Sequence, residues 1–161
     1  MLAQKQKQKL KFNQQGFTLI ELFLVIAILV LVILLILIGL QEIKKRSRDT
    51  QRKNDLQQIV KALELYVQGP GKGKFPIQEE WACFNDPLGN EIDLLVLKNI
   101  IRNLPNEPLS SQSPRCYYYM SDGLDYKLAA QMEADKKIMK NDGGSSDLLY
   151  ELYTDKSANW P

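Results

Sequence analysis

QQGFTLIEL, residues 14–22, leads directly into an apolar segment that ends at Leu40. Between Leu22 and Leu40 there is no charged or polar side chain, and a helix over these residues would be about 28 Å long, close to the hydrocarbon thickness of a bilayer. We therefore predict a transmembrane helix over residues 17–40. Glu21 places a carboxylate at the edge of this segment. Because a charge there costs about 2.5–3.5 kcal/mol on insertion scales, we expect Glu21 to have a functional partner.

The residues up to Gly16 form a polar, basic leader. They carry a charge of +4 and no acidic residue, so the rest of the chain carries −2 of the overall +2, which argues against a generally basic, nucleic-acid-binding protein; the basic residues are Lys5, Lys7, Lys9 and Lys11. A conventional secretory signal is cut after its apolar core, at small residues. Here the small residue precedes the core, so a cut between Gly16 and Phe17 would remove the leader and keep the membrane helix.

This cut would give Glu21 a partner. The new α-amine of Phe17 would be mostly cationic at neutral pH, and Glu21 follows it by four residues. The pair could form within one chain or between neighbouring chains. A pair between chains would fix the axial register of adjacent helices, because a slip by one turn leaves two charges unpaired in lipid. The alternative is a Glu21 side chain that only extends to the membrane surface.

The remaining sequence predicts an α+β fold. After the leader (1–16) and the membrane helix (17–40), we expect an amphipathic helix (41–67) and a globular head (68–161). One apolar stripe follows the helical period, formed by Leu56, Ile59, Val60, Leu63, Tyr66 and Val67. In the head we expect a short helix over residues 91–103, strands over 116–119, 126–132 and 148–153, and a turn at 121–123. A long N-terminal helix would thus pack on a small antiparallel sheet.

The residue inventory argues against catalysis. The chain has no histidine, which excludes Ser-His-Asp and Cys-His nucleophiles and histidine-based zinc sites. Its two cysteines, Cys83 and Cys116, would form a disulfide worth about 3–4 kcal/mol if the head lies outside the cytoplasm, and would otherwise be unpaired thiols.

A basic cluster follows the membrane helix, formed by Lys44, Lys45, Arg46, Arg48, Arg52 and Lys53. It favours either contact with lipid head groups or pairing with acidic faces of neighbouring subunits. Because positive charge flanks both ends of the membrane helix, the positive-inside rule does not orient it.

Gly16-Phe17-Thr18-Leu19-Ile20-Glu21-Leu22, followed by an aliphatic run, resembles the prepilin signature of type IV pilins and type II secretion pseudopilins. The resemblance implies a type IV pilin-like fold, cleavage after Gly16 by a prepilin peptidase, N-methylation of Phe17 and a role for Glu21 in recruiting subunits. It also implies a cytoplasmic N-terminus, an extracytoplasmic head, and an assembly platform and ATPase as partners.

Two features depart from this family. Many pilins have a proline that kinks the helix, and this chain has Ile38-Gly39-Leu40 in the corresponding region. The acidic calcium-binding loop of major pseudopilins also has no clear counterpart, although calcium could still be bound by oxygen ligands from Asp122, Asp125, Asp142 and Asp147. Such residues more often form turns, so we expect no cofactor.

We therefore expect a structural subunit that polymerises with itself and with minor pilins in a pilus or pseudopilus anchored in the cytoplasmic membrane. The alternatives are a single-pass membrane protein whose head binds a ligand or partner without polymerising, and a membrane-anchored enzyme. Whether the filament serves secretion, motility, adhesion or DNA uptake is left open by the sequence.

Overall fold

The computed structural model describes residues 16–84, 86, 90–111 and 115–160, with the backbone but not the side chain of Ile38. The first fifteen residues of the predicted leader lie outside this range. The chain divides into two units, and the boundary falls between Leu40 and Gln41.

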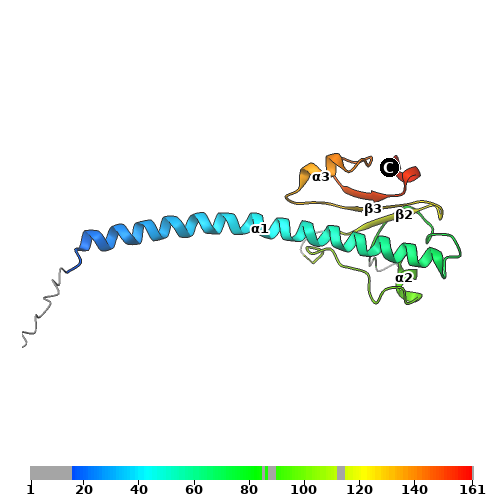
Figure 1. The fold of residues 1–161 in the computed structure, drawn as a ribbon, viewed down its shortest axis with the longest axis horizontal. Coiled ribbons are helices and arrows are strands. Elements are labelled where there is room, and N and C mark those ends of the chain that lie inside the picture. The colour runs from blue at the N-terminus through cyan, green and yellow to red at the C-terminus, as the bar shows by residue number, and fades with distance from the viewer. Residues whose placement is uncertain (1–15, 85, 87–89, 112–114, 161) are drawn as a thin grey trace, which may run out of the picture. The chain divides into compact units, whose positions relative to one another are not determined.

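One long helix, α1 (Leu19–Gln68), runs through both units and includes Gly39 (Figure 1). It ends where Gly69 and Pro70 follow, because proline cannot continue the helical hydrogen-bond pattern. The Gly71 N–H donates to the Tyr66 carbonyl at 2.7 Å and closes the last turn. The long helix predicted from the sequence is therefore confirmed.

The head contains a four-stranded antiparallel sheet in the order β1-β2-β3-β4. Its strands are β1 (Gln78–Cys83), β2 (Tyr118–Ser121), β3 (Tyr126–Ala130) and β4 (Tyr150–Tyr153). The β2–β3 turn uses Gly123 at a φ of 93°, a conformation that costs glycine little, and its N–H donates to Ser121 Oγ at 3.0 Å. The α+β class, with a long N-terminal helix and a small antiparallel sheet, is confirmed.

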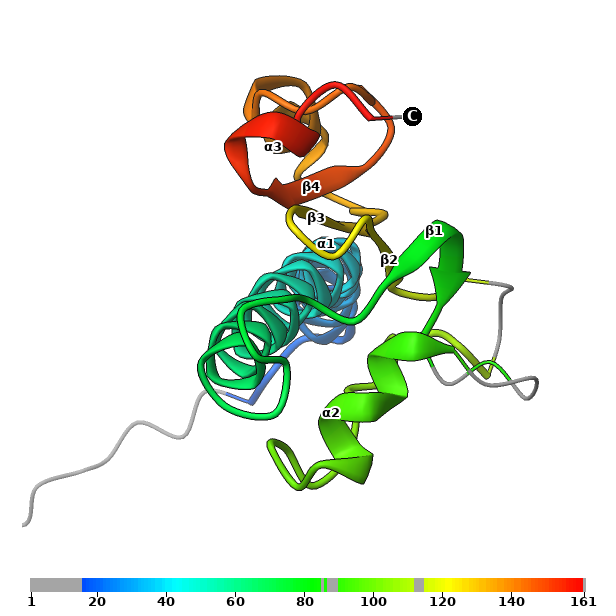
Figure 2. The ribbon, with the colours of Figure 1, turned by 90° about the vertical axis from the view of Figure 1, so that its right-hand side faces the viewer.

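The apolar stripe of α1 forms the core of the head. Leu56, Ile59 and Leu63 are fully buried, and they belong to one cluster with side chains of the sheet and of residues 92–104. Figure 2, seen along α1, shows the sheet on one side of the head part of the helix and α2 (Leu94–Leu97) on another. Tyr117 and Tyr119 are buried whereas Tyr118 is half-buried, as expected for side chains that alternate between two faces.

Residues 91–103 do not form the single helix that we predicted. A 3₁₀ turn, η1 (Glu91–Asp93), leads into α2, which ends after one turn. Asn99 then has a φ of 56°, and the N–H groups of Asn99 and Ile100 donate to the Val96 and Leu95 carbonyls, both at 2.9 Å. This is a Schellman ending with asparagine in the left-handed position, and it explains why the apolar spacing overestimated the helix length.

Three elements were not predicted: β1, α3 (Lys136–Asn141) and η2 (Asp155–Ser157). β1 lies at one edge of the sheet and carries the exposed residues Glu79 and Glu80. Charged side chains are common on edge strands because they discourage pairing with another chain, and they obscure the alternation that identifies a strand. α3 and η2 are too short to show a helical period.

Cys83 and Cys116 are joined by a disulfide with a Cα–Cα distance of 5.5 Å. Cys83 ends β1, and Cys116 lies two residues before β2. The bond therefore links the C-terminal end of β1 to the segment that leads into β2, its antiparallel neighbour.

The C-terminal segment is held against the sheet by a buried ammonium group. Lys127 of β3 is fully buried, and its Nζ lies 3.2 Å from Glu151 Oε2 of β4. The same Nζ donates to Ser145 Oγ at 2.6 Å and to the main-chain carbonyls of Trp160 and Ala158 at 2.7 and 3.3 Å. Four oxygen atoms thus replace the water that a buried cation loses.

Candidate assembly site

Glu21 caps the start of α1. Its Oε2 accepts hydrogen bonds from the Thr18 N–H at 3.3 Å and from Thr18 Oγ1 at 3.1 Å, while the Glu21 N–H donates to Thr18 Oγ1 at 3.3 Å. These reciprocal bonds form a capping box, which satisfies N–H groups that have no partner inside the helix. The carboxylate is therefore directed toward the N-terminal end of α1.

Thr18 is the residue of this site that the sequence analysis missed. We expected Glu21 to pair with an amine at Phe17, and the described structure gives it Thr18 as its hydrogen-bond partner. The signal was available, because threonine followed three positions later by glutamate at the start of an apolar run is the capping-box pattern. Gly16 and Phe17 precede the helix, and a side chain at Gly16 would meet no atom within 4 Å.

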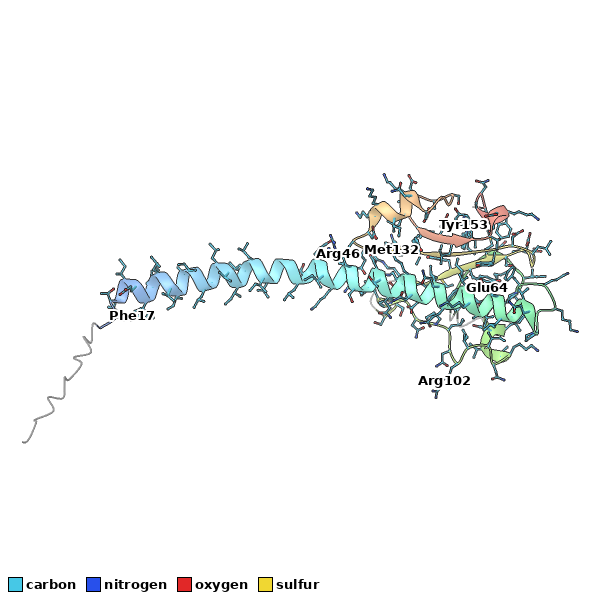
Figure 3. All side chains as sticks on the ribbon, viewed as in Figure 1. Phe17, Arg46, Glu64, Arg102, Met132 and Tyr153 are labelled. Atoms are coloured by element: carbon cyan, nitrogen blue, oxygen red, sulfur yellow. A yellow bond between two sulfur atoms is a disulfide. The ribbon has the colours of Figure 1, made fainter. Side chains whose placement is uncertain are left out.

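The first half of α1 has no covering within the described chain. Each large apolar side chain from Leu19 to Leu37 exposes at least 43% of its surface, and Figure 3 shows these side chains extending outward from the helix after Phe17. By length and composition, α1 can cross a membrane, and its most apolar 18-residue window has a mean hydropathy of 3.7. A continuous apolar surface of this extent requires lipid or other helices as its environment.

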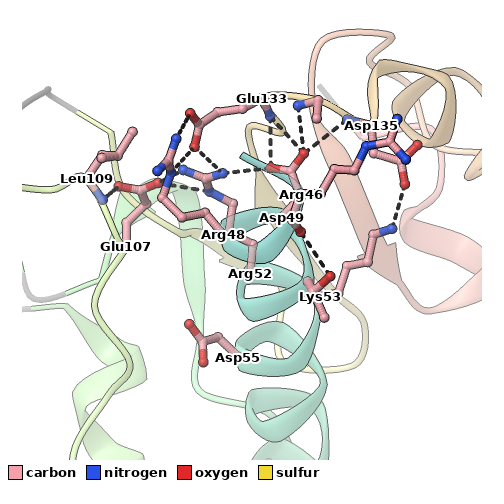
Figure 4. A network of polar contacts seen from close by, with 12 residues as sticks. Arg46, Arg48, Asp49, Arg52, Lys53, Asp55, Glu107, Leu109, Glu133 and Asp135 are labelled. Atoms are coloured by element: carbon pink, nitrogen blue, oxygen red, sulfur yellow. Dashed lines mark hydrogen bonds and ion pairs between the residues drawn. The ribbon is translucent and has the colours of Figure 1, made fainter. Parts of the chain in front are cut away.

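In the head, Arg52 of α1 lies at the centre of a buried ionic network (Figure 4). Its Nη1 lies 2.7 Å from Asp49 Oδ1 and 2.8 Å from Glu133 Oε1, and its Nε donates to Glu107 Oε1 at 2.9 Å. Arg48 binds Glu133 through two bonds of 2.7 and 2.6 Å. The network joins α1 to the loops that contain Glu107 and Glu133.

Asp49 extends this network to the start of α3. Its carboxylate accepts the main-chain N–H groups of Glu133, Ala134 and Asp135 at 2.8 to 3.1 Å. Lys53, one turn further along α1, pairs with the Asp135 carboxylate at 2.8 Å. Three side chains of the basic cluster, Arg48, Arg52 and Lys53, are therefore paired inside the head. Neither alternative that we considered for the cluster included this intramolecular role.

The contacts of the network lower the pKa of two carboxylates, Glu133 and Asp49. The Arg48 guanidinium, together with Arg52, lowers the pKa of Glu133 to about 2 against the opposing effect of burial. Burial alone would raise the pKa of Asp49, but the three N–H groups and Arg52 hold it below its usual value. Glu133 therefore remains ionised down to strongly acidic pH, and Asp49 keeps its charge at a lower pH than an unperturbed aspartate does.

Acidic pH is expected to destabilise the head. Because the folded-state pKa of Glu133 is about 2 and its usual value is 4.5, its contribution to stability is present above pH 4.5 and is lost as the pH falls toward 2. Asp49 acts in the same direction. Thermal unfolding of the detergent-solubilised chain, measured at stepwise lower pH, should show the melting temperature falling through this window, by roughly 3–5 °C for each kcal/mol lost.

Two variants test whether Glu133 causes the loss of stability at acidic pH. Glu133→Gln should be less stable than the unmodified chain at neutral pH and should lose less stability on acidification. Glu79→Gln, at an exposed position of β1, should leave both properties unchanged. An unchanged acid response in Glu133→Gln would contradict the role of Glu133.

The four aspartates considered for calcium do not gather into a site. Asp122 Oδ1 accepts the N–H groups of Leu124 and Asp125, each at 2.8 Å, and Asp142 accepts those of Gly144 and Glu151. Within the residues that the structure describes, no group of three or more His, Cys, Asp or Glu side chains could hold a metal ion. The carboxylates of Asp122 and Asp142 instead order the turns that contain them.

Comparison with known families gives a match that coincides with this site. Residues 11–39 match the prokaryotic N-terminal methylation motif. No curated protein and no solved structure gave a match. The matched range contains Gly16, Phe17, Thr18 and Glu21 together with nearly all of the uncovered apolar surface of α1. The chain thus carries the N-terminal methylation motif that marks a prepilin of the type IV pilin and pseudopilin family.

Proposed function

We propose that this chain is a structural subunit of a type IV pilus or a type II secretion pseudopilus. In this proposal a prepilin peptidase cuts between Gly16 and Phe17, Phe17 is N-methylated, and the mature chain polymerises through residues 17–40. The observation that carries the proposal is the uncovered apolar half of α1, which has a single carboxylate, Glu21, within the methylation motif. Lipid accommodates such a surface before assembly, and the helices of other subunits cover it afterwards.

Glu21 would fix the register of the assembled helices. The cut leaves the Thr18–Glu21 capping box intact, since both residues follow the scissile bond. The carboxylate is directed toward the end of the helix where the new amine of Phe17 forms. The amine of the same or of a neighbouring chain could therefore join the capping box without a change of helix conformation.

The proposal places the leader in the cytoplasm and the head on the opposite side of the membrane. An oxidising environment on that side would suit the disulfide between Cys83 and Cys116. The partners are other copies of the chain, minor pilins, the peptidase, the assembly platform and its ATPase. The chain itself performs no catalytic step.

Substituting Gly16 with valine is expected to leave the full-length precursor in the membrane and to prevent filament formation. Because a side chain at this position meets nothing within 4 Å, the change should not disturb the described fold. Mass spectrometry of the N-terminus should find methylated Phe17 in the unmodified chain and the intact leader in the variant. Gly39→Ala, which also places a methyl group in open space, serves as the matched control.

An N-terminal Phe17 in the Gly16→Val variant would contradict the assigned cleavage site. Complete processing of the unmodified chain without any filament, in cells that assemble other pilins, would instead favour a single-pass protein that does not polymerise.

A further inference from the structure

The structure separates the basic cluster after the membrane helix into two parts. Arg48, Arg52 and Lys53 are paired with carboxylates of the head. Lys44 and Lys45 are exposed and form no ion pair within the described residues, and Arg46, whose side chain is 75% exposed, has only a 3.6 Å contact with Glu42 of the same helix. The second part therefore retains its charge for a partner outside the chain.

α3 adds three more exposed basic side chains at the same end of the head. Asp49 and Lys53 of α1 bind the segment immediately before α3, so this short helix lies beside the entry of α1 into the head (Figures 1 and 3). Its lysines, Lys136, Lys137 and Lys140, are exposed and form no ion pair within the described residues. We call these three side chains, together with Lys44, Lys45 and Arg46, the basic collar.

One collar residue, Arg46, lines a concave polar surface that reaches Asp135, the residue just before α3. A cavity of about 310 Å³ lies between α1 and the segment before α3, lined by Arg46, Asp49, Thr50, Lys53, Ala134 and Asp135. Figure 4 shows Arg46, Lys53 and Asp135 around this region.

We propose that the basic collar binds the head groups of anionic phospholipids while the chain is anchored in the membrane. Lys44 follows Leu40, the last residue of the apolar segment, by four residues, or about 6 Å of helix, which is within the head-group layer of a bilayer. This inference requires membrane anchoring and does not require polymerisation.

The arrangement of the charges favours a lipid surface over a second protein copy. Lys44, Lys45 and Arg46 are consecutive, so their side chains point in directions about 100° apart around the helix. Together they span about 200° of the circumference of α1, whereas contact with a neighbouring subunit would require the charges on one face. A plane of head groups around a membrane helix can reach all three directions, and α3 extends the positive surface away from the helix.

Lysine reactivity of the full-length chain in nanodiscs tests this inference. Monomeric protein would be placed in phosphatidylcholine discs with and without phosphatidylglycerol, and acylation of each lysine would be followed by mass spectrometry. Because anionic head groups stabilise the unreactive ammonium form, the five collar lysines should react about fivefold more slowly in the anionic discs. Salt at about 1 M should remove the difference, since the Debye length falls to about 3 Å.

Lys72 and Lys74 provide the internal control. Both are exposed, and both follow the far end of α1, about 33 Å of helix beyond Arg46 and well outside the Debye length of about 8 Å at physiological salt. Their reactivity should be the same in both discs. Equal reactivity of Lys136, Lys137 and Lys140 in the two discs would overturn the proposal. Protection that depends on protein density and not on lipid charge would also overturn it, and would indicate a second copy as the partner.

Lipid retention gives an independent measurement. Lys136→Gln/Lys137→Gln/Lys140→Gln should co-purify with less phosphatidylglycerol than the unmodified chain, whereas Lys72→Gln/Lys74→Gln should not differ from it. Equal retention by the two variants would contradict a lipid-binding role of α3. If both variants still form filaments, the lipid-binding role of α3 is judged separately from the proposed function.

Discussion

Replacing Glu21 with alanine is expected to abolish filament assembly and to leave membrane insertion intact. The variant removes the only charged side chain between residues 17 and 40, so it also removes the cost that this carboxylate adds to membrane insertion. Assembly loses the partner of the Phe17 amine. A buried charge left without its partner costs about 3–5 kcal/mol, and this cost recurs at every subunit of a polymer. Sheared filaments quantified against the membrane-bound pool provide the measurement.

The Glu21→Gln variant distinguishes the effect of the carboxylate charge from the effect of the helix cap. Glutamine can form the capping box with Thr18, but it has no charge to offer the amine. If the ion pair fixes the register, this variant should assemble as poorly as Glu21→Ala. Leu22→Ala, at the neighbouring apolar position, is the control for a loss of helix contact. Normal filaments from Glu21→Gln would disprove the register mechanism and would leave Glu21 only the role of a cap.

Replacing Arg52 with methionine is expected to destabilise the head by about 3–5 kcal/mol. Methionine replaces the aliphatic part of the arginine side chain, but it leaves the carboxylates of Asp49, Glu107 and Glu133 without the guanidinium that bonds to all three. Denaturant unfolding of the detergent-solubilised chain, followed by near-UV circular dichroism of the tyrosine-rich core, would measure the loss. If the variant does not fold in detergent, the protease resistance of the membrane-bound variant can be compared with that of the unmodified chain, and it should be lower.

Two further arginine variants make the Arg52 prediction specific. Arg52→Lys keeps the charge but cannot match the planar fork of the guanidinium, so an intermediate loss is expected. Arg46→Met removes an exposed arginine six residues earlier on the same helix and should cost less than about 0.5 kcal/mol. Equal stabilities of Arg52→Met and Arg46→Met would show that the network is not needed to hold the head on α1.

The sequence predicted the elements whose signal extends over many residues. The apolar run is recognised by its length and composition, the stripe from Leu56 to Tyr66 by the helical period, and the strands around Tyr118 and Tyr126 by their residue types and the turn between them. β1 and the end of α2 were missed because local chemistry determines them. Edge charges at Glu79 and Glu80 conceal the strand, and a left-handed Asn99 ends the helix before the apolar pattern does.

The site was predicted in part for a similar reason. Gly16, Phe17 and Glu21 belong to a contiguous pattern, so the sequence alone identified them. Arg52 and its partners come from positions 49, 107 and 133, and only the folded chain brings them together. Without that arrangement, the arginines after the membrane helix were indistinguishable from surface charges.

The position of the first helical residue has a consequence for proteolysis. α1 begins at Leu19, so the Gly16–Phe17 bond lies outside the first turn, in backbone that forms no regular structure. Proteases bind their substrates in extended form, and a bond inside a helix must first be unwound. Here the cap at Thr18 and Glu21 ends the helix two residues short of the bond. The proposed peptidase could therefore bind and cut its substrate while the entire membrane-spanning helix stays folded in the bilayer.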